Sequence, residues 1–232
     1  MKIVLRPTYA VLTALCFLFS ISAVAQQLTD RDFIRKGIKE WGECRTVALT
    51  EKNGDVAVYG ENGSARSGCP KEMDAALTEL YTQKAFISDV VLTEKGKWLI
   101  CYGHNGFMGN QMPKALHREL TAFNQQKEIV NTVTFNDKKD WIVVTDKHFS
   151  SSSKELQQLL SAGRQSYGPI LTVCLSNDAC VLLFEKGYKY TGEVPASLLK
   201  ALDETQLKVH RLKICGNAWF FADKEGKFEY EM

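Results

Sequence analysis

Cysteine and histidine are the residue types in this sequence that could act together as a nucleophile and its base. The pair closest along the chain is Cys101 and His104, separated by two residues. A thiolate beside an imidazole is the arrangement of cysteine hydrolases, so a secreted hydrolase with this Cys/His pair is one hypothesis. However, Cys101 stands inside an apolar run and His104 stands in a polar turn. This placement favours a structural cysteine, and we assign no catalytic residue.

Motifs that carry other chemistry are missing from the sequence. It contains no Gly-x-Ser-x-Gly or His-Glu-x-x-His motif, so it does not indicate a serine hydrolase or a zinc protease. It contains no Cys-x-x-Cys pair and no cluster of His and Cys at the spacing of zinc ligands. We therefore expect neither a metal site nor a cofactor.

Aromatic residues are the stronger candidates for a function. Trp98, Trp141 and Trp219 open the second strand of three predicted β-hairpins, and Tyr59 and Tyr102 end the equivalent strand of two. A row of indoles could stack on sugar rings or anchor a partner chain. The alternative is that they close the hairpins and fill the core. We predict a non-catalytic binding or structural scaffold, with a protein or carbohydrate partner at these five residues.

The N-terminus has the pattern of a cleaved secretory signal peptide. Two basic residues precede an apolar run over residues 11–21, and Ala23-Val24-Ala25 supplies the small residues of a cleavage site. The apolar run is too short to span a bilayer. We predict a signal peptide over residues 1–25 and an exported product, periplasmic or extracellular, that begins at Gln26.

Export would permit disulfide bonds. Seven cysteines occur in the chain, and all but Cys16 follow the predicted signal peptide. An even number of cysteines in an exported protein is compatible with a disulfide framework. A three-residue hairpin loop over residues 176–178 would place Cys174 opposite Cys180 at bridging distance, whereas a longer or shorter loop would not. Cys174–Cys180 is thus a possible disulfide.

The charge balance argues against a nucleic-acid partner. The whole chain has 29 Lys+Arg and 27 Asp+Glu, and the predicted signal peptide contributes Lys2 and Arg6 without any acid. The mature chain is then formally neutral and has no long basic run, unlike proteins that displace counterions from phosphates. No second apolar run is long enough to cross a membrane, so we expect no membrane span.

A pattern that recurs about every 41 residues predicts the elements that position these side chains. Each copy has a helix followed by a β-hairpin, and the helix begins near Pro70, Pro113, Ser153 or Pro195. A first helix is predicted over residues 30–41. The helices are amphipathic. The first hairpin strands alternate, with aligned apolar positions over residues 47–50, 90–93, 133–136, 173–176 and 212–215.

We predict an α+β fold in which one domain, residues 26–232, contains five tandem helix-plus-hairpin units. Antiparallel hairpins would form a curved or closed sheet with the helices on one face. The second strand of each hairpin is apolar on both sides, so either the sheet curls or a partner covers its other face. The unit bounds are about 29–68, 69–111, 112–152, 153–193 and 194–232.

One local motif resembles a known repeat. Tyr59-Gly60-Glu61-Asn62-Gly63 matches Tyr102-Gly103-His104-Asn105-Gly106, and in the second unit the motif lies between Trp98 and Pro113-x-x-Leu116. This resembles the Trp-Val…Tyr-Gly-x-Asn-Gly-aromatic…Pro-x-x-Leu type of tandem repeat, of about forty residues, in uncharacterised, mostly secreted bacterial proteins. The resemblance implies no activity. Glycines at positive φ predict a tight turn that leads from strand to helix.

Overall fold

The computed structural model describes residues 29–232, so the predicted signal peptide and Cys16 lie outside the described residues. Within this range the order helix–strand–strand–strand occurs five times. The helices are α1 (Asp30–Trp41), α2 (Lys71–Thr82), α3 (Lys114–Gln125), α4 (Lys154–Tyr167) and α5 (Ala196–Glu204).

Each helix is followed by a separate three-stranded antiparallel sheet whose strands pair in sequence order. The first two sheets are β1 (Thr46–Ala48), β2 (Asp55–Tyr59), β3 (Gly63–Ser67), and β4 (Ile87–Leu92), β5 (Trp98–Tyr102), β6 (Gly106–Asn110). The third and fourth are β7 (Val130–Phe135), β8 (Trp141–Thr145), β9 (Phe149–Ser151), and β10 (Ile170–Leu175), β11 (Ala179–Phe184), β12 (Gly187–Gly192). The fifth is β13 (Arg211–Cys215), β14 (Ala218–Ala222), β15 (Phe228–Glu231).

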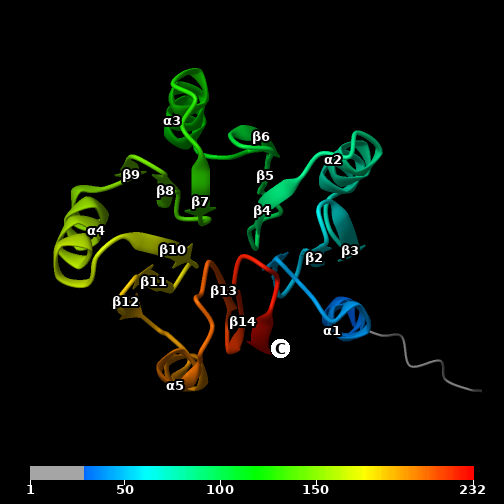
Figure 1. Cartoon of the computed structure of the whole chain (residues 1–232). Coiled ribbons are helices and arrows are strands. Elements are labelled where there is room, and N and C mark those ends of the chain that lie inside the picture. The colour runs from blue at the N-terminus through cyan, green and yellow to red at the C-terminus, as the bar shows by residue number, and fades with distance from the viewer. Residues whose placement is uncertain (1–28) are drawn as a thin grey trace, which may run out of the picture.

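The five sheets surround a common axis. Their first strands contact one another in the order β1, β4, β7, β10, β13, and β13 contacts β1. The helices lie at the outside of this ring, and the first strands lie nearest its centre (Figure 1). The expected α+β class is therefore confirmed, but the expected single curved or closed sheet with helices on one face is wrong. The sheets instead stand side by side in the manner of propeller blades.

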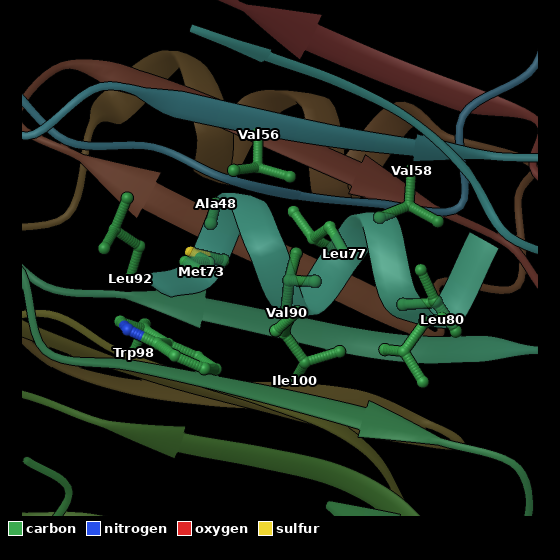
Figure 2. Packing of buried hydrophobic residues seen from close by; sticks show 12 residues of the cluster. Ala48, Val56, Val58, Met73, Leu77, Leu80, Val90, Leu92, Trp98 and Ile100 are labelled. Carbon is green, nitrogen blue, oxygen red and sulfur yellow. The ribbon is translucent and has the colours of Figure 1, made fainter. Parts of the chain in front are cut away.

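This arrangement explains why the second strands are apolar on both sides. Each helix covers the outer end of a gap between two neighbouring sheets, and both sheets turn apolar side chains into that gap. Figure 2 shows one such cluster, in which Leu77 of α2 lies among Val58 of β2 and Val90 of β4. A sheet has a neighbour on each side, so both of its faces are buried. The neighbouring sheets, rather than a partner or curling, cover the second face.

The last sheet joins the first through α1. Ile34 and Ile38 of α1 share a buried cluster with Val47 of β1 and Phe220 of β14. The Cys44 backbone N–H also donates to the carbonyl oxygen of Gly226, at 2.9 Å. The interface between the two ends of the described chain is thus built as the other four are, although its two sheets come from opposite ends of the sequence.

The Tyr-Gly-x-Asn-Gly motif closes a second hairpin rather than leading directly to the helix. Gly60 has φ 55°, and Tyr59 pairs with Gly63 across the turn. A Cβ on Gly63 would lie 2.5 Å from the Tyr59 ring, so glycine is required there. Asn62 Nδ2 donates to the Tyr81 carbonyl oxygen at the end of α2, at 3.2 Å. Eight residues, 63–70, separate the turn from α2, and they have room for the third strand that the sequence pattern did not reveal.

The helix starts agree with their sequence markers in position but not in every detail. The three prolines occupy the N-cap itself rather than the first helical turn. In α4 the cap is Ser153, whose hydroxyl accepts from the Leu156 N–H at 3.2 Å.

Candidate binding pocket

The first strands of the sheets place polar side chains near the axis. Thr46 of β1, Asp89 of β4, and Arg211 and Lys213 of β13 contact one another, and we call these four residues the axial cluster. Asp89 Oδ1 accepts from Thr46 Oγ1 at 2.9 Å and from Lys213 Nζ at 2.8 Å. Because β1 lies between β4 and β13 in the ring, the Lys213–Asp89 bond reaches across the centre.

The axial cluster has more positive than negative charge. Asp89 is only 2% exposed, and its single carboxylate faces Lys213 and, at 3.9 Å, Arg211. Burial raises the pKa of Asp89, but the two cations outweigh it and hold the pKa below its ordinary value. Asp89 Oδ2 has no hydrogen-bond partner among the described residues. One carboxylate thus balances two cations.

A pocket of about 470 Å³ opens at one end of the axis, where the first strands begin. All five units contribute to its wall. Phe86 and Ile129, which precede β4 and β7, remain 37% and 42% exposed within it. The rest of the apolar wall is formed by Val130, Ile170 and Leu171.

The remaining wall is polar and includes three cations and one carboxylate. Arg45 places its guanidinium carbon 4.6 Å from the centre of the Phe86 ring, and Arg211 and Lys224 line the same pocket. The one lining carboxylate, Asp223, accepts at Oδ1 from the backbone N–H groups of Glu225 and Lys227, at 3.0 and 2.9 Å. That carboxylate is therefore engaged in the turn between β14 and β15.

Two histidines also line the pocket. His104 is exposed, whereas His210 is half-buried. Burial, together with the charges of Lys224, Arg211 and Lys208, lowers the pKa of His210 to about 4. His210 is therefore neutral at pH 7, and it lies in a positive local potential.

The opposite end of the axis has a smaller hollow, of about 180 Å³, where the first strands end. Here a turn side chain from each of units two, three and four reaches the backbone of the preceding unit. Glu94 accepts from the Glu51 N–H at 2.9 Å, and Asp137 accepts from the Lys95 N–H at 3.1 Å. Asn177 accepts from the Asp137 N–H at 3.0 Å. These bonds tie successive units together, so we read this end as structural.

The tryptophans proposed as a binding surface are buried. Trp98, Trp141 and Trp219 are 5%, 6% and 6% exposed and belong to the clusters between sheets. Tyr59 stacks on Trp41, with ring centres 3.8 Å apart, and the Tyr102 ring covers Gly106. The interpretation of the three tryptophans as an exposed platform is wrong, because neighbouring sheets cover the face that carries the indoles. Tyr59 and Tyr102 are half-buried.

The three buried tryptophans are expected to fluoresce at short wavelength and to resist quenching by acrylamide. Trp41, which is only partly buried, should be replaced by phenylalanine first so that the others are observed alone. Acrylamide titration of the folded variant and of the same variant in denaturant gives the comparison. A red-shifted, readily quenched spectrum of the folded protein would contradict the packing between sheets.

The expected Cys174–Cys180 disulfide is also wrong. Leu175, not Cys174, pairs with Cys180, because the loop has only two residues, Asn177 and Asp178, between paired positions. This shift by one residue puts Cys174 and Cys180 on opposite faces of the sheet, in different clusters. Residues 29–232 contain six free cysteines and no disulfide.

The Cys101 and His104 pair does not form a catalytic site. Cys101 is buried in β5, and burial raises the pKa of its thiol to about 12. His104 lies exposed in the following turn. A thiol that stays protonated at neutral pH is a poor nucleophile.

Among residues 29–232, no three His, Cys, Asp or Glu side chains gather where they could hold a metal ion. Within the same residues, no helix has the length and apolar character needed to cross a bilayer.

Sequence reasoning missed the pocket because its lining is scattered. Phe86 and Ile129 occupy equivalent positions just before two first strands. An apolar residue that recurs at this repeat position is the sequence signal for the pocket. Asp89 was a second signal, since it stands where units one, three and four have Thr46, Thr132 and Thr172. A charged residue in an otherwise apolar strand indicates a buried partner.

Comparisons with known proteins identify no family for this chain. No protein-family model and no curated protein sequence matches this chain. Among solved structures, virginiamycin B lyase from Staphylococcus aureus is similar over 82% of this chain and 69% of its own. The identity is 9% and the TM-score 0.26, so no shared fold or activity follows from this similarity.

Proposed function

We propose that this chain is an exported, non-catalytic binding protein. Its ligand site would be the pocket of about 470 Å³ that is lined by Phe86 and Ile129, which we call the axial pocket. The observation that carries the proposal is the exposure of Phe86 and Ile129 inside a pocket that all five units build. Large apolar side chains left open to solvent in a concave site favour binding over a purely structural role. Support for export comes from the sequence pattern of residues 1–25.

The size of the pocket favours a small molecule over a polymer. Its volume of about 470 Å³ lies within the range of roughly 300–1,000 Å³ that is typical of small-molecule sites. The hypothesis of a surface that binds a protein or glycan required exposed indoles, and the indoles are buried. The hypothesis of a hydrolase required Cys101 as the nucleophile, but its thiol is buried and protonated.

The ring also suits a binding role because it fixes the pocket. Arg45, Ile129 and His210 come from units one, three and five, and they are held near one another by the packing of the sheets. A site built on packed strands keeps its shape without a ligand, which reduces the entropic cost of binding.

A neutral apolar dye tests the proposed site. N-phenyl-1-naphthylamine fluoresces strongly only in apolar surroundings, and we expect it to bind the purified mature protein with about one dye per chain. Ile129→Glu should abolish this binding, because a carboxylate would occupy the apolar wall. Folding should be unaffected, since Ile129 is 42% exposed.

Phe33→Glu is the matched control for this experiment. Phe33 is an exposed aromatic residue on α1 and does not line the pocket. Its replacement should leave the dye titration unchanged. Equal dye binding by Ile129→Glu and the unaltered protein would mean that the apolar site is elsewhere, and absence of dye binding by the unaltered protein would contradict the proposed function.

A further inference from the structure

We propose that the axial pocket selects a small organic carboxylate, with its charge against Arg45, Arg211 and Lys224 and its apolar body against Phe86 and Ile129. This inference rests on the proposed function, because it names the chemical class that the same site would take. It is carried by the distribution of charge around the pocket and by the unused hydrogen-bond donors there.

Two of the three cations that line the pocket lack a carboxylate partner. Among residues 29–232, neither Arg45 nor Lys224 has an acidic oxygen within 4 Å, the distance that defines a salt bridge. Asp223 is engaged in its own turn, and Asp89 is shared between Arg211 and Lys213. A negatively charged ligand would supply the missing partner.

Arg211 is held in place but retains free donors. Its Nε and Nη2 atoms donate to the carbonyl oxygen of Ser88 at 3.0 and 2.8 Å, and Nη1 donates to the carbonyl oxygen of His210 at 2.6 Å. A guanidinium has five N–H groups, so two remain without an acceptor in the described residues. A planar carboxylate matches such donors better than a spherical anion does.

The neutral state of His210 is consistent with this charge distribution. Positive charges on Lys224, Arg211 and Lys208 add to burial in lowering its pKa to about 4. An anion bound beside these cations would offset their effect and raise the pKa of His210. This shift gives an observable that does not depend on the affinity itself.

The apolar wall favours an organic anion over inorganic phosphate. Phe86, Ile129, Ile170 and Leu171 line the pocket and offer no hydrogen-bond donor from their side chains. A ligand that is charged throughout would leave this wall in contact with water, whereas an aromatic or aliphatic acid would cover it.

An isosteric pair of probes separates charge from shape. We expect 2-naphthoate to bind at least about tenfold more tightly than the neutral 2-naphthamide in isothermal titration calorimetry, because charge-assisted hydrogen bonds are stronger than neutral ones. Arg45→Gln and Lys224→Gln should each weaken naphthoate binding severalfold and leave naphthamide binding unchanged. Lys71→Gln, at an exposed lysine on α2 outside the pocket, should alter neither.

Each result decides the inference. Equal affinity for the two probes, unchanged naphthoate binding in both Arg45→Gln and Lys224→Gln, or tighter binding of inorganic phosphate than of naphthoate would overturn it. Dye binding that responds to Ile129→Glu without a preference for naphthoate would refute carboxylate selection alone. Failure of the dye and both probes to bind would refute the proposed function as well. In the supporting case, NMR titration of the His210 ring should show a higher pKa with naphthoate than without it.

Discussion

Phe220→Ala is expected to lower the free energy of unfolding by about 3–5 kcal/mol, because it removes a fully buried aromatic ring. The effect should extend to the other end of the chain. Phe220 lies in β14 of the last sheet, but its cluster includes Ile34 and Ile38 of α1 and Val47 of β1. A cavity there weakens the contact that joins the last sheet to the first.

Hydrogen exchange distinguishes this effect from a general loss of stability. In Phe220→Ala, amides of α1 and β1 should lose protection together with those of β13–β15. Phe135→Ala is the matched control, since Phe135 is an equally buried ring in the cluster between the second and third sheets. If α1 kept its protection in Phe220→Ala while β13–β15 lost theirs, closure of the ring through α1 would be contradicted.

Asp89→Ala is expected to destabilise the protein by about 3–5 kcal/mol, the usual cost of removing one partner from a buried ion pair. The change leaves Lys213 and Arg211, whose side chains are 13% and 17% exposed, without a carboxylate. Chemical denaturation provides the measurement. Asp178→Ala, which removes an exposed pair with Lys138, should cost no more than about 1 kcal/mol.

A double variant tests whether the loss comes from unbalanced charge. Asp89→Leu combined with Lys213→Met should recover part of the stability lost in Asp89→Leu alone, because a cation is then no longer buried unpaired. Losses that simply add in the double variant would argue against the Lys213–Asp89 pair as the cause.

The pH dependence has a defined sign. The folded pKa of Asp89 lies below its unfolded value, so its contribution to stability is present above the unfolded pKa and is lost as the pH falls through the folded value. The protein should therefore lose stability on acidification below about pH 4. The Asp89→Asn variant should lose less stability over the same pH interval.

The sequence by itself determined the local elements. Helices have one apolar stripe, so their positions follow from a spacing such as that of Met73, Leu77 and Leu80. Alternation along the first strands likewise separated Val90 and Leu92 on one face from Val91 on the other. These patterns are short-range, because side-chain direction in a helix or strand depends on position along the chain.

Only the tertiary structure decided what covers each face. The sequence showed that β5 is apolar on both sides, but curling, a partner chain and a neighbouring sheet all satisfy that pattern. The third strands were missed because β6 and β12 expose much of their surface and lack a strong alternation. The Cys174–Cys180 disulfide depended on a single residue of loop length, which residue types do not specify.

The pocket forms only in the tertiary structure. Arg45, Phe86, Ile129 and Arg211 are far apart in the sequence and converge only because β13 returns to β1 and closes the ring. The sequence determined which side chains stand at the start of each first strand. The packing of five sheets around one axis decided that these starts lie together, because each sheet can bury its second apolar face only against a neighbour.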